Sequence, residues 1–315
     1  MRYNKQETFS KIGKTGQELI TSSTITILGI GALGTNTLNL LARAGVGKIK
    51  IIDRDVVELS NLQRQTLFSE EDIDKPKVYA AKEKINKINS KVKIETYLTD
   101  LDYENVEILK SGLILDCTDN IYTRFLINEY SRKNNIPWIY ASVIGSKGMV
   151  MNVTEKTPCF NCIIKEPNEP LDTCDSSGVI GSAASAIASI QATEAIKILT
   201  KQDYCRELIH YDLWKNKINR IKVNKNKYCK TCNKVYEYLE GKKKKLIKIC
   251  GSCNYQIEIK KDMNLVFAKL SSLRDVKPEN ECLILENAII FKSGRALVKA
   301  ENENKAKAIL DGYLG

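Results

Sequence analysis

The first half of the chain repeats the order strand, helix, strand. Short runs of β-branched and other apolar residues predict strands at 24–30, 48–53, 92–98, 113–116 and 137–142. Apolar residues at helical spacing predict helices at 33–44, 76–89 and 121–134. This alternation is typical of parallel strands joined by right-handed crossovers. The pattern therefore predicts an α/β fold with a doubly wound, Rossmann-like and mostly parallel sheet.

The pattern changes after residue 145 and again after residue 224. Adjacent strands at 148–153 and within 207–223 surround one long helix at 181–199, which predicts an antiparallel extension of the sheet. Residues 225–249 form a basic segment with candidate zinc ligands. Beyond it we expect a small α+β unit: a strand at 256–259, a helix at 265–272, a hairpin at 282–298 turning at Glu286–Asn287, and a helix at 304–313. The expected domains are 1–224 and 250–315, joined by 225–249.

Composition excludes several classes of protein. The 315 residues are 43% hydrophobic and 28% charged, which excludes a collagen, a long coiled coil and wholesale disorder. The stretch nearest to a membrane span, 178–199, contains Gln191, Glu194 and Lys197, so we expect a tightly packed helix instead. Its small residues suit either the core or a two-fold dimer contact. The N-terminus has no apolar core of a signal peptide, so we expect a cytoplasmic protein.

The chain is basic, with a formal net charge of +11. A lysine-rich surface, an acidic protein partner and nucleic acid binding would each explain this charge. Arg supplies only ten of the 49 basic residues, which disfavours a site built for base readout. The run Lys242–Lys245 is either an exposed turn, which we favour, or a binding patch.

A glycine-rich turn follows the first predicted strand. Gly29, Gly31 and Gly34 form G-x-G-x-x-G between this strand and the next helix. The first glycine makes the turn, the second lets backbone approach a phosphate, and the third lets helix and strand pack closely. Asp53 ends the following strand, where an acid can hold a ribose hydroxyl. We interpret these residues as a nucleotide site, with a purely structural tight turn as the alternative.

Cationic residues beyond Asp53 favour a triphosphate over a nicotinamide cofactor. Arg64 and Lys77 could neutralise phosphates, a need that hydride transfer does not have. Asp119 follows the strand 113–116 at the carboxyl edge of the sheet, and is either a magnesium ligand or a helix N-cap. A nicotinamide-dependent oxidoreductase and a zinc-containing, basic nucleic-acid-binding protein stay open as alternative functions.

Cysteines are the other chemically distinctive residues. Six of the ten form C-x-x-C pairs, at Cys159/Cys162, Cys229/Cys232 and Cys250/Cys253. Such pairs in a reducing compartment are typical of metal sites, and spacing alone suits a local zinc ribbon of the last two pairs. The single histidine, His210, excludes a His-based triad or a multi-His metal centre.

Longer motifs resemble the ThiF/MoeB/HesA family, relatives of ubiquitin-activating enzymes. The matching segments are RYNKQ at 2–6, GIGALG at 29–34, DRDVVELSNLQRQ at 53–65, DKPK at 74–77, DCTDN at 116–120 with Arg124 behind it, PCFNC at 158–162 and TCDSSGVIG at 173–181. The resemblance implies an adenylyltransferase that uses ATP and Mg²⁺. Members of the family activate the C-terminal glycine of a ubiquitin-like sulfur-carrier protein (ThiS/MoaD-like) and release pyrophosphate.

The resemblance also implies roles for individual residues. It implies nucleotide contacts from Gly29, Gly31, Gly34, Asp53, Asn61, Arg64 and Lys77, with Asp119 on magnesium and Asn120 beside it. It implies a structural zinc on Cys159, Cys162, Cys229 and Cys232, which would staple the fold and leave Cys250 and Cys253 as ordinary thiols or a redox pair. Cys174 would either join covalently to the activated carrier or be an unreactive loop thiol. Lys5 stands where the family usually has an Arg that reaches the neighbouring subunit's phosphate site.

Partners follow from the same resemblance. It implies a homodimer, a sulfur-carrier protein and a sulfur donor such as a cysteine desulfurase. The pathway stays open between thiamine, molybdopterin and tRNA thiolation. We interpret the small C-terminal unit as a module for partner docking or carrier recognition.

Overall fold

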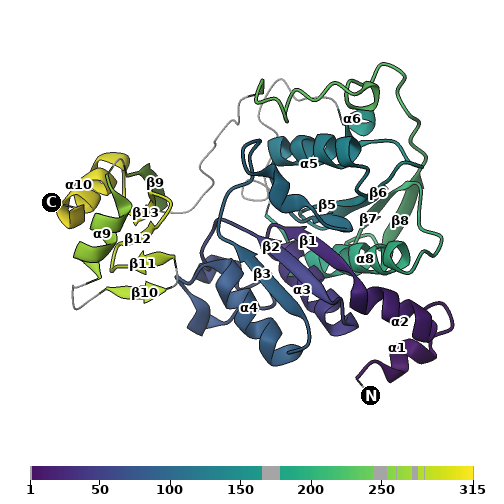
Figure 1. Ribbon diagram of the computed structural model, residues 1–315, viewed down its shortest axis with the longest axis horizontal. Helices are drawn as coiled ribbons and strands as arrows, with labels where there is room; N and C mark the ends of the chain where they lie inside the picture. Colours follow the sequence, from purple (N-terminus) through teal and green to yellow (C-terminus); the bar gives the residue numbers. More distant parts are fainter. Residues whose placement is uncertain are drawn as a thin grey trace. The chain divides into compact units, whose positions relative to one another are not determined.

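The structure, a computed structural model, comprises two compact units, Met1–Lys245 and Leu246–Gly315 (Figure 1). It describes residues 2–164, 178–243, 254–259, 261–271, 276–279 and 281–314. Cys174, Cys250 and Cys253 lie outside the described residues.

The first unit is built on an eight-stranded sheet with the order β3-β2-β1-β4-β5-β6-β7-β8. The strands from β3 to β5 in this order are parallel, and those from β5 to β8 pair antiparallel. This confirms the predicted doubly wound, mostly parallel sheet with its antiparallel extension. The strands are β1 (Thr24–Leu28), β2 (Lys48–Ile52), β3 (Lys93–Tyr97), β4 (Leu113–Asp116), β5 (Trp138–Ile144), β6 (Lys147–Val153), β7 (Leu208–Asp212) and β8 (Lys217–Ile221).

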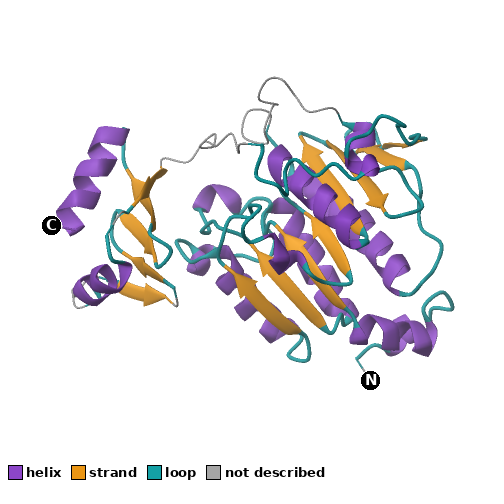
Figure 2. Ribbon diagram, turned by 45° about the horizontal axis from the view of Figure 1, so that its top comes forward, coloured by secondary structure: helices purple, strands orange, loops and turns teal. Residues whose placement is uncertain are grey.

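Helices cover both faces of this sheet (Figure 2). The side chains of α3, α4 and α8 pack on one face, and those of α5 on the other. The long helices lie within one residue of their predicted bounds, whereas α1 and α2 were not predicted. The helices are α1 (Asn4–Thr8), α2 (Gly13–Ser22), α3 (Ala32–Ala44), α4 (Lys77–Ile88), α5 (Ile121–Asn134), α6 (Phe160–Ile163) and α8 (Gly181–Leu199). No helix in the described part of the chain combines the length and apolar character needed to cross a membrane.

Side chains of β1 alternate between two hydrophobic cores. Ile25 and Ile27 belong to the core beneath α3 and α8, and Leu28 belongs to the core beneath α5. Because both faces of the parallel strands are covered, their sequences are continuously apolar rather than alternating. Full burial of each such side chain contributes roughly 1.5–3 kcal/mol. These two cores hold the carboxyl ends of β1, β2 and β4 in place.

The described part of the basic segment packs against α5 within the first unit. Cys229 and Tyr238 are buried in the core beneath α5. The carboxylate of Glu129, on α5, accepts hydrogen bonds from the backbone N–H groups of Tyr238 and Leu239 at 2.8 and 3.0 Å. Within the lysine run, Lys242 forms an ion pair with a nearby glutamate. The chain therefore stays attached to α5 for several residues beyond the last cysteine of this segment.

The second unit is a five-stranded antiparallel sheet with the order β10-β11-β12-β13-β9. The turn at Glu286–Asn287 joins β11 to β12 as predicted, but 282–298 continues through a second turn into β13. Its hydrophobic core includes Val266 and Leu270 of α9 and Leu310 of α10. The elements are β9 (Asn254–Glu258), α9 (Met263–Leu270), β10 (Lys277–Glu279), β11 (Cys282–Ile284), β12 (Ala288–Phe291), β13 (Arg295–Lys299) and α10 (Glu303–Leu314).

Glu129 gives the first unit a specific dependence on pH. Burial raises the pKa of Glu129 from 4.5 to about 7, although the two backbone N–H groups partly oppose this. The folded state then holds a proton that the unfolded state has released, so stability is lost as pH rises toward 7. We expect Glu129→Gln to weaken this pH dependence. Urea unfolding of parent and variant at about pH 5.5 and about pH 7.5 measures it; equal pH dependence in both proteins would contradict the assignment.

Candidate nucleotide and metal sites

The glycine turn between β1 and α3 is shaped by close backbone packing. A Cβ atom at Gly29, where φ is +86°, would lie 2.7 Å from the carbonyl oxygen of Cys117. A Cβ atom at Gly34 would lie 1.9 Å from the carbonyl oxygen of Gly29. At Gly31, by contrast, a Cβ atom would meet only the Gln65 amide nitrogen, at 3.9 Å. The turn therefore requires its first and third glycines for packing, while the second leaves open space at the start of α3, where N–H groups favour an anion.

Asp53 ties this turn to the end of β2. One carboxylate oxygen accepts the Ile30 N–H at 2.6 Å, and the other accepts the Asp55 N–H at 2.7 Å. Burial raises the pKa of Asp53, while the nearby Lys77 ammonium lowers it. Each oxygen keeps a lone pair after these bonds, so the carboxylate could still accept a ribose hydroxyl.

Lys77 is the first residue of α4 and lies among carboxylates. It is 7% exposed, and its Nζ lies 3.6 Å from an oxygen of Asp55. Burial lowers the pKa of Lys77, but Asp55, Asp53, Asp119 and Glu58 outweigh this and raise it above the usual value. The lysine is therefore charged at neutral pH. Asp55, which sequence reasoning did not assign to the site, is its direct partner.

Asp119 and Asn120 lie in the loop that joins β4 to α5. Asp119 is exposed, and its carboxylate is near enough to influence Lys77. The N-cap of α5 is Asn120, whose side chain accepts the Thr123 N–H at 3.3 Å. The N-cap alternative for Asp119 is therefore wrong, and its carboxylate is left to face solvent.

A buried ion pair shapes the same loop. Arg124 lies 3.1 Å from the carboxylate of Asp116, and this carboxylate also accepts the Thr118 N–H at 2.9 Å. Arg124 donates to the Thr118 carbonyl and sits 5.1 Å over the ring of Tyr140. Sequence reasoning had noted Arg124 only as part of the resemblance. Through these contacts Arg124 holds Asp116 and Thr118 in place, directly before Asp119.

Arg64 and Asn61 belong to a tight turn beside the glycine turn. The Asn61 carbonyl accepts the N–H groups of Arg64 and Gln65 at 3.1 and 3.0 Å. The amide of Gln65 is the group nearest to a Cβ at Gly31, and Gly181 packs against the backbone of the same turn from α8. The turn thus adjoins the open space at Gly31. The Arg64 guanidinium donates to the Ser60 carbonyl at 3.0 Å.

Lys5 lies at the opposite end of α3 from the glycine turn. The ring of Tyr3 fills the space over Gly45, just after α3, and Gln6 donates to the Ala44 carbonyl at 3.0 Å. Thirteen helical residues place the two ends of α3 about 20 Å apart. The structure therefore does not bring Lys5 to the glycine turn of its own chain.

Four thiols from distant parts of the chain meet beside α5. The Sγ atom of Cys159 lies 3.7 Å from Cys162, 3.4 Å from Cys229 and 3.4 Å from Cys232. All four sulfurs lie within 4.8 Å of one another. Tetrahedral zinc with Zn–S bonds of about 2.3 Å would separate its sulfurs by about 3.8 Å, so the donor set fits zinc.

The surroundings shift the pKa values of these thiols in different directions: against the effect of burial, hydrogen bonds from the Asn226 and Cys159 backbone lower the pKa of Cys162. Burial raises the pKa of Cys159, and it raises the pKa of Cys229 to about 11. A bound divalent cation would stabilise the thiolates that crowding and burial disfavour. The structure thus assembles the pairing implied by the family resemblance. Cys250 and Cys253, the partners in the alternative ribbon, lie outside the described residues.

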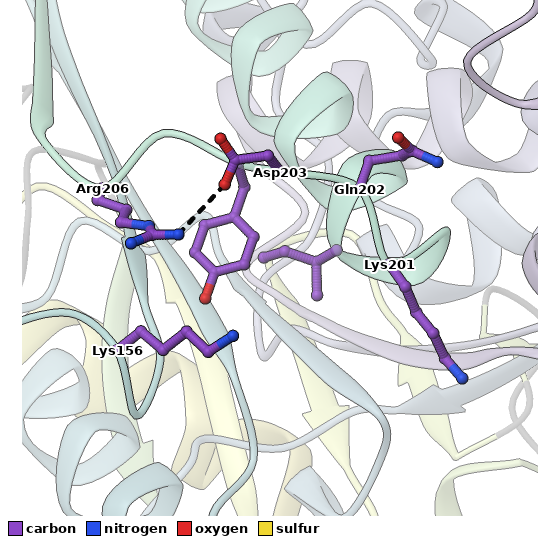
Figure 3. A pocket seen from close by; sticks show the side chains of 7 residues that line it. Lys156, Lys201, Gln202, Asp203 and Arg206 are labelled. Atoms are coloured by element: carbon purple, nitrogen blue, oxygen red, sulfur yellow. Dashed lines mark hydrogen bonds and ion pairs between the residues drawn. The ribbon is translucent and has the colours of Figure 1, made fainter.

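A separate cavity of about 330 Å³ lies where α8 ends (Figure 3). Arg206 there pairs with Asp203 at 3.4 Å. The basic side chains of this cavity lie near the C-terminal end of α8. The partial negative charge of a helix C-terminus favours cations, so their presence needs no bound ligand. None of the residues assigned to the nucleotide lines this cavity, which is formed by Lys156, Ile198, Lys201, Gln202, Asp203, Tyr204 and Arg206.

The geometry defines a domain of the doubly wound α/β class, with a cationic and acidic cluster at the carboxyl edge of its sheet, where domains of this class bind their ligands. Residues 3–231 match the ThiF family. The chain belongs to the ThiF family. This confirms the resemblance on which the residue assignments were based.

Two similar sequences and one similar solved structure support this family membership and the fold. "Sulfur carrier protein ThiS adenylyltransferase" of Bacillus subtilis is 36% identical over 100% of this chain and 99% of that protein. "Molybdopterin-synthase adenylyltransferase" of Salmonella typhimurium is 34% identical over 74% of this chain and 96% of that protein. A crystal structure of Escherichia coli MccB with MccA-N7isoASN has a TM-score of 0.67 at 22% identity, covering 74% of this chain and 75% of that one, and supports the fold. These relatives favour neither the oxidoreductase nor the nucleic-acid-binding alternative.

Two glycines of the turn predict different responses to a methyl group. Gly34→Ala is expected to destabilise the fold by about 1–3 kcal/mol, because the new Cβ overlaps the Gly29 carbonyl. Gly31→Ala is expected to leave stability nearly unchanged but to weaken ATP binding, because it occupies the open space. Urea unfolding and calorimetric titration with Mg·ATP measure the two effects. Unimpaired ATP binding by Gly31→Ala would place the nucleotide elsewhere.

Proposed function

We propose that this chain is an ATP-dependent adenylyltransferase that activates the C-terminal glycine of a ubiquitin-like sulfur-carrier protein as an acyl-adenylate. The observation that carries the proposal is the charged cluster of Lys77 with Asp53 and Asp119, in which Asp53 is bonded to the Ile30 N–H next to Gly31. A carboxylate oxygen of the carrier forms a bond to the α-phosphorus of ATP. The bond from that phosphorus to the oxygen bridging the α- and β-phosphates breaks, and pyrophosphate leaves.

This reaction needs cations more than a general base. The carrier carboxylate is already a nucleophile, but it must approach an anionic phosphate. Lys77 carries its charge into the site on a buried stem, and the turn of Arg64 stands beside the glycine turn. His210 lies on β7 and is not needed. Bound magnesium would neutralise phosphate charge, and the exposed carboxylate of Asp119 would hold it.

The full-length likeness to a protein named for ThiS favours a ThiS-type carrier. That likeness includes the second unit, whereas the molybdopterin-synthase relative matches only 74% of this chain. We therefore propose sulfur transfer for thiamine biosynthesis ahead of molybdopterin or tRNA thiolation. The second unit would recognise the carrier or the sulfur donor, for example a cysteine desulfurase.

The position of Lys5 favours a homodimer. Because α3 separates Lys5 from the glycine turn of its own chain, the residue can assist phosphate binding only in a partner subunit. Cys174 would join covalently to the activated carrier during sulfur transfer. The four clustered cysteines would hold a structural zinc that fastens residues 229–232 to the first unit.

Loss of Lys77 is the direct test of the proposed chemistry. Purified parent protein with a ThiS-type carrier is expected to catalyse carrier-dependent ATP–pyrophosphate exchange. Lys77→Ala and Arg64→Ala are expected to lower kcat/KM on the order of 100-fold, because each removes a cation from the phosphates. Lys87→Ala, at the exposed far end of α4, is the matched control and is expected to behave like the parent. Absence of exchange in the parent would refute the proposed function.

The metal assignment has its own test. Elemental analysis is expected to find zinc at about one ion per chain in the parent, as for other four-cysteine sites. Cys159→Ser is expected to lose it, because a tetrahedral site cannot close without this sulfur. Cys250→Ser, outside the four-thiol cluster, is the control and is expected to keep it. Loss of zinc in Cys250→Ser with retention in Cys159→Ser would support the local ribbon instead.

A further inference from the structure

A buried glutamine lies beneath the proposed nucleotide site. Gln191, in the middle of α8, is 0% exposed. Its amide nitrogen donates to the carbonyl oxygens of Asp116 at 2.8 Å and Ile139 at 3.2 Å. Its amide oxygen accepts from the Thr37 hydroxyl at 2.8 Å and the Cys117 thiol at 3.3 Å. All of the hydrogen-bonding positions of this side chain are therefore used.

Three of the four partners of Gln191 belong to the two sides of the site, and the fourth, Ile139, is on β5. Thr37 is on α3, the helix that starts at the glycine turn, and its hydroxyl is fully buried. Asp116 ends β4, and Cys117 follows it directly in the loop that carries Asp119. The two sides touch where Gly29 lies against the Cys117 carbonyl. Gln191 bonds to α3 through Thr37 and to the end of β4 through Asp116 and Cys117. These bonds therefore hold the two segments at a fixed separation.

The same helix supports the third part of the site. Gly181, the first residue of α8, packs against the carbonyl of Gln63, next to Arg64. A Cβ atom at Gly181 would lie 2.7 Å from that oxygen. α8 therefore contacts the Arg64 turn with its first residue, and the other two parts of the site through Gln191.

We propose that Gln191 is a positioning residue for the nucleotide. Its amide holds the glycine turn and the Asp119 loop at the spacing that ATP and magnesium require. The inference rests on the proposed function. An apolar replacement would remove the bonds of Gln191 to the Thr37 hydroxyl and to the two carbonyl groups, and would let the two sides move. A displacement of about 1 Å is enough to cost on the order of 100-fold in rate.

The test compares two buried amide side chains: Gln191, which is on α8, and Asn152, which is on β6 and bonds to α8. Gln191→Leu removes the bonds described above. Asn152→Leu is the matched control: Asn152 is 1% exposed and donates to Glu194 of α8 at 2.6 Å and to the Cys205 carbonyl, beyond the end of this helix, at 2.9 Å. Both variants are expected to melt at lower temperature than the parent. Steady-state exchange is measured for all three proteins well below both melting transitions.

The two variants are expected to differ in kinetics. Gln191→Leu should lower kcat/KM for ATP by about 10- to 100-fold and raise the magnesium concentration needed for half-maximal rate, with the KM for the carrier unchanged. Asn152→Leu should stay within about twofold of the parent in all three quantities. Equal losses in both variants, or parental kinetics in Gln191→Leu, would show that Gln191 serves stability alone and would overturn the proposal.

Two further measurements keep the result decisive. Should Gln191→Leu fail to fold, Thr37→Val removes one of its bonds at constant shape, and the same selective loss is expected at smaller size. If Gln191→Leu and Thr37→Val both fold, the double variant should lose less activity than the sum of the two single losses, because both changes break the same hydrogen-bond network. Titration with Mg·ATP alone separates the two hypotheses: a parent that binds Mg·ATP without catalysing exchange refutes the proposed function. The weaker binding expected of Gln191→Leu would still support the positioning role, and unchanged binding would refute it.

Discussion

The carboxylate of Asp53 holds two backbone segments at once, and the nucleotide site depends on this tie. One oxygen fixes the turn at Ile30, and the other fixes Asp55. Asp55 in turn faces Lys77 across 3.6 Å. A buried carboxylate is unfavourable unless it is hydrogen-bonded and near a cation, and both conditions are met here. The glycine turn, the cation and the acidic cluster are thus one electrostatic unit rather than separate elements.

Close backbone packing complements this charge network. Gly29 lies against the Cys117 carbonyl and Gly34 against the Gly29 carbonyl, so β1, α3 and the end of β4 approach within distances that no side chain would allow. The approach leaves room only at Gly31. The N–H groups at the start of α3 give this space a positive character, which would suit the proposed phosphate.

The residues that the sequence could assign to the site lie at the ends of predicted strands and helices. The glycines, Asp53 and Lys77 each follow directly from the end of a strand or the start of a helix, so the pattern of β1, β2 and α4 places them. Distinguishing Asp119 from Asn120 as the N-cap requires backbone angles that composition does not carry. Gln191 is an ordinary polar residue of a small-residue helix until tertiary folding brings α3, β4 and β5 around it. The short, largely polar helices α1 and α2 likewise lack the long apolar stripe that marks α3.

The four-cysteine cluster imposes an order on how the first unit can be completed. Two of its sulfurs come from residues 159–162, and the other two follow α8 and both final strands of the sheet. During synthesis the N-terminal strands leave the ribosome first and can pair with one another before Cys229 exists. An ion captured early by Cys159 and Cys162 would have only half of its ligands. The complete cluster can therefore form only after all eight strands of the sheet have been synthesised, and it would then join residues 229–232 to residues 159–162.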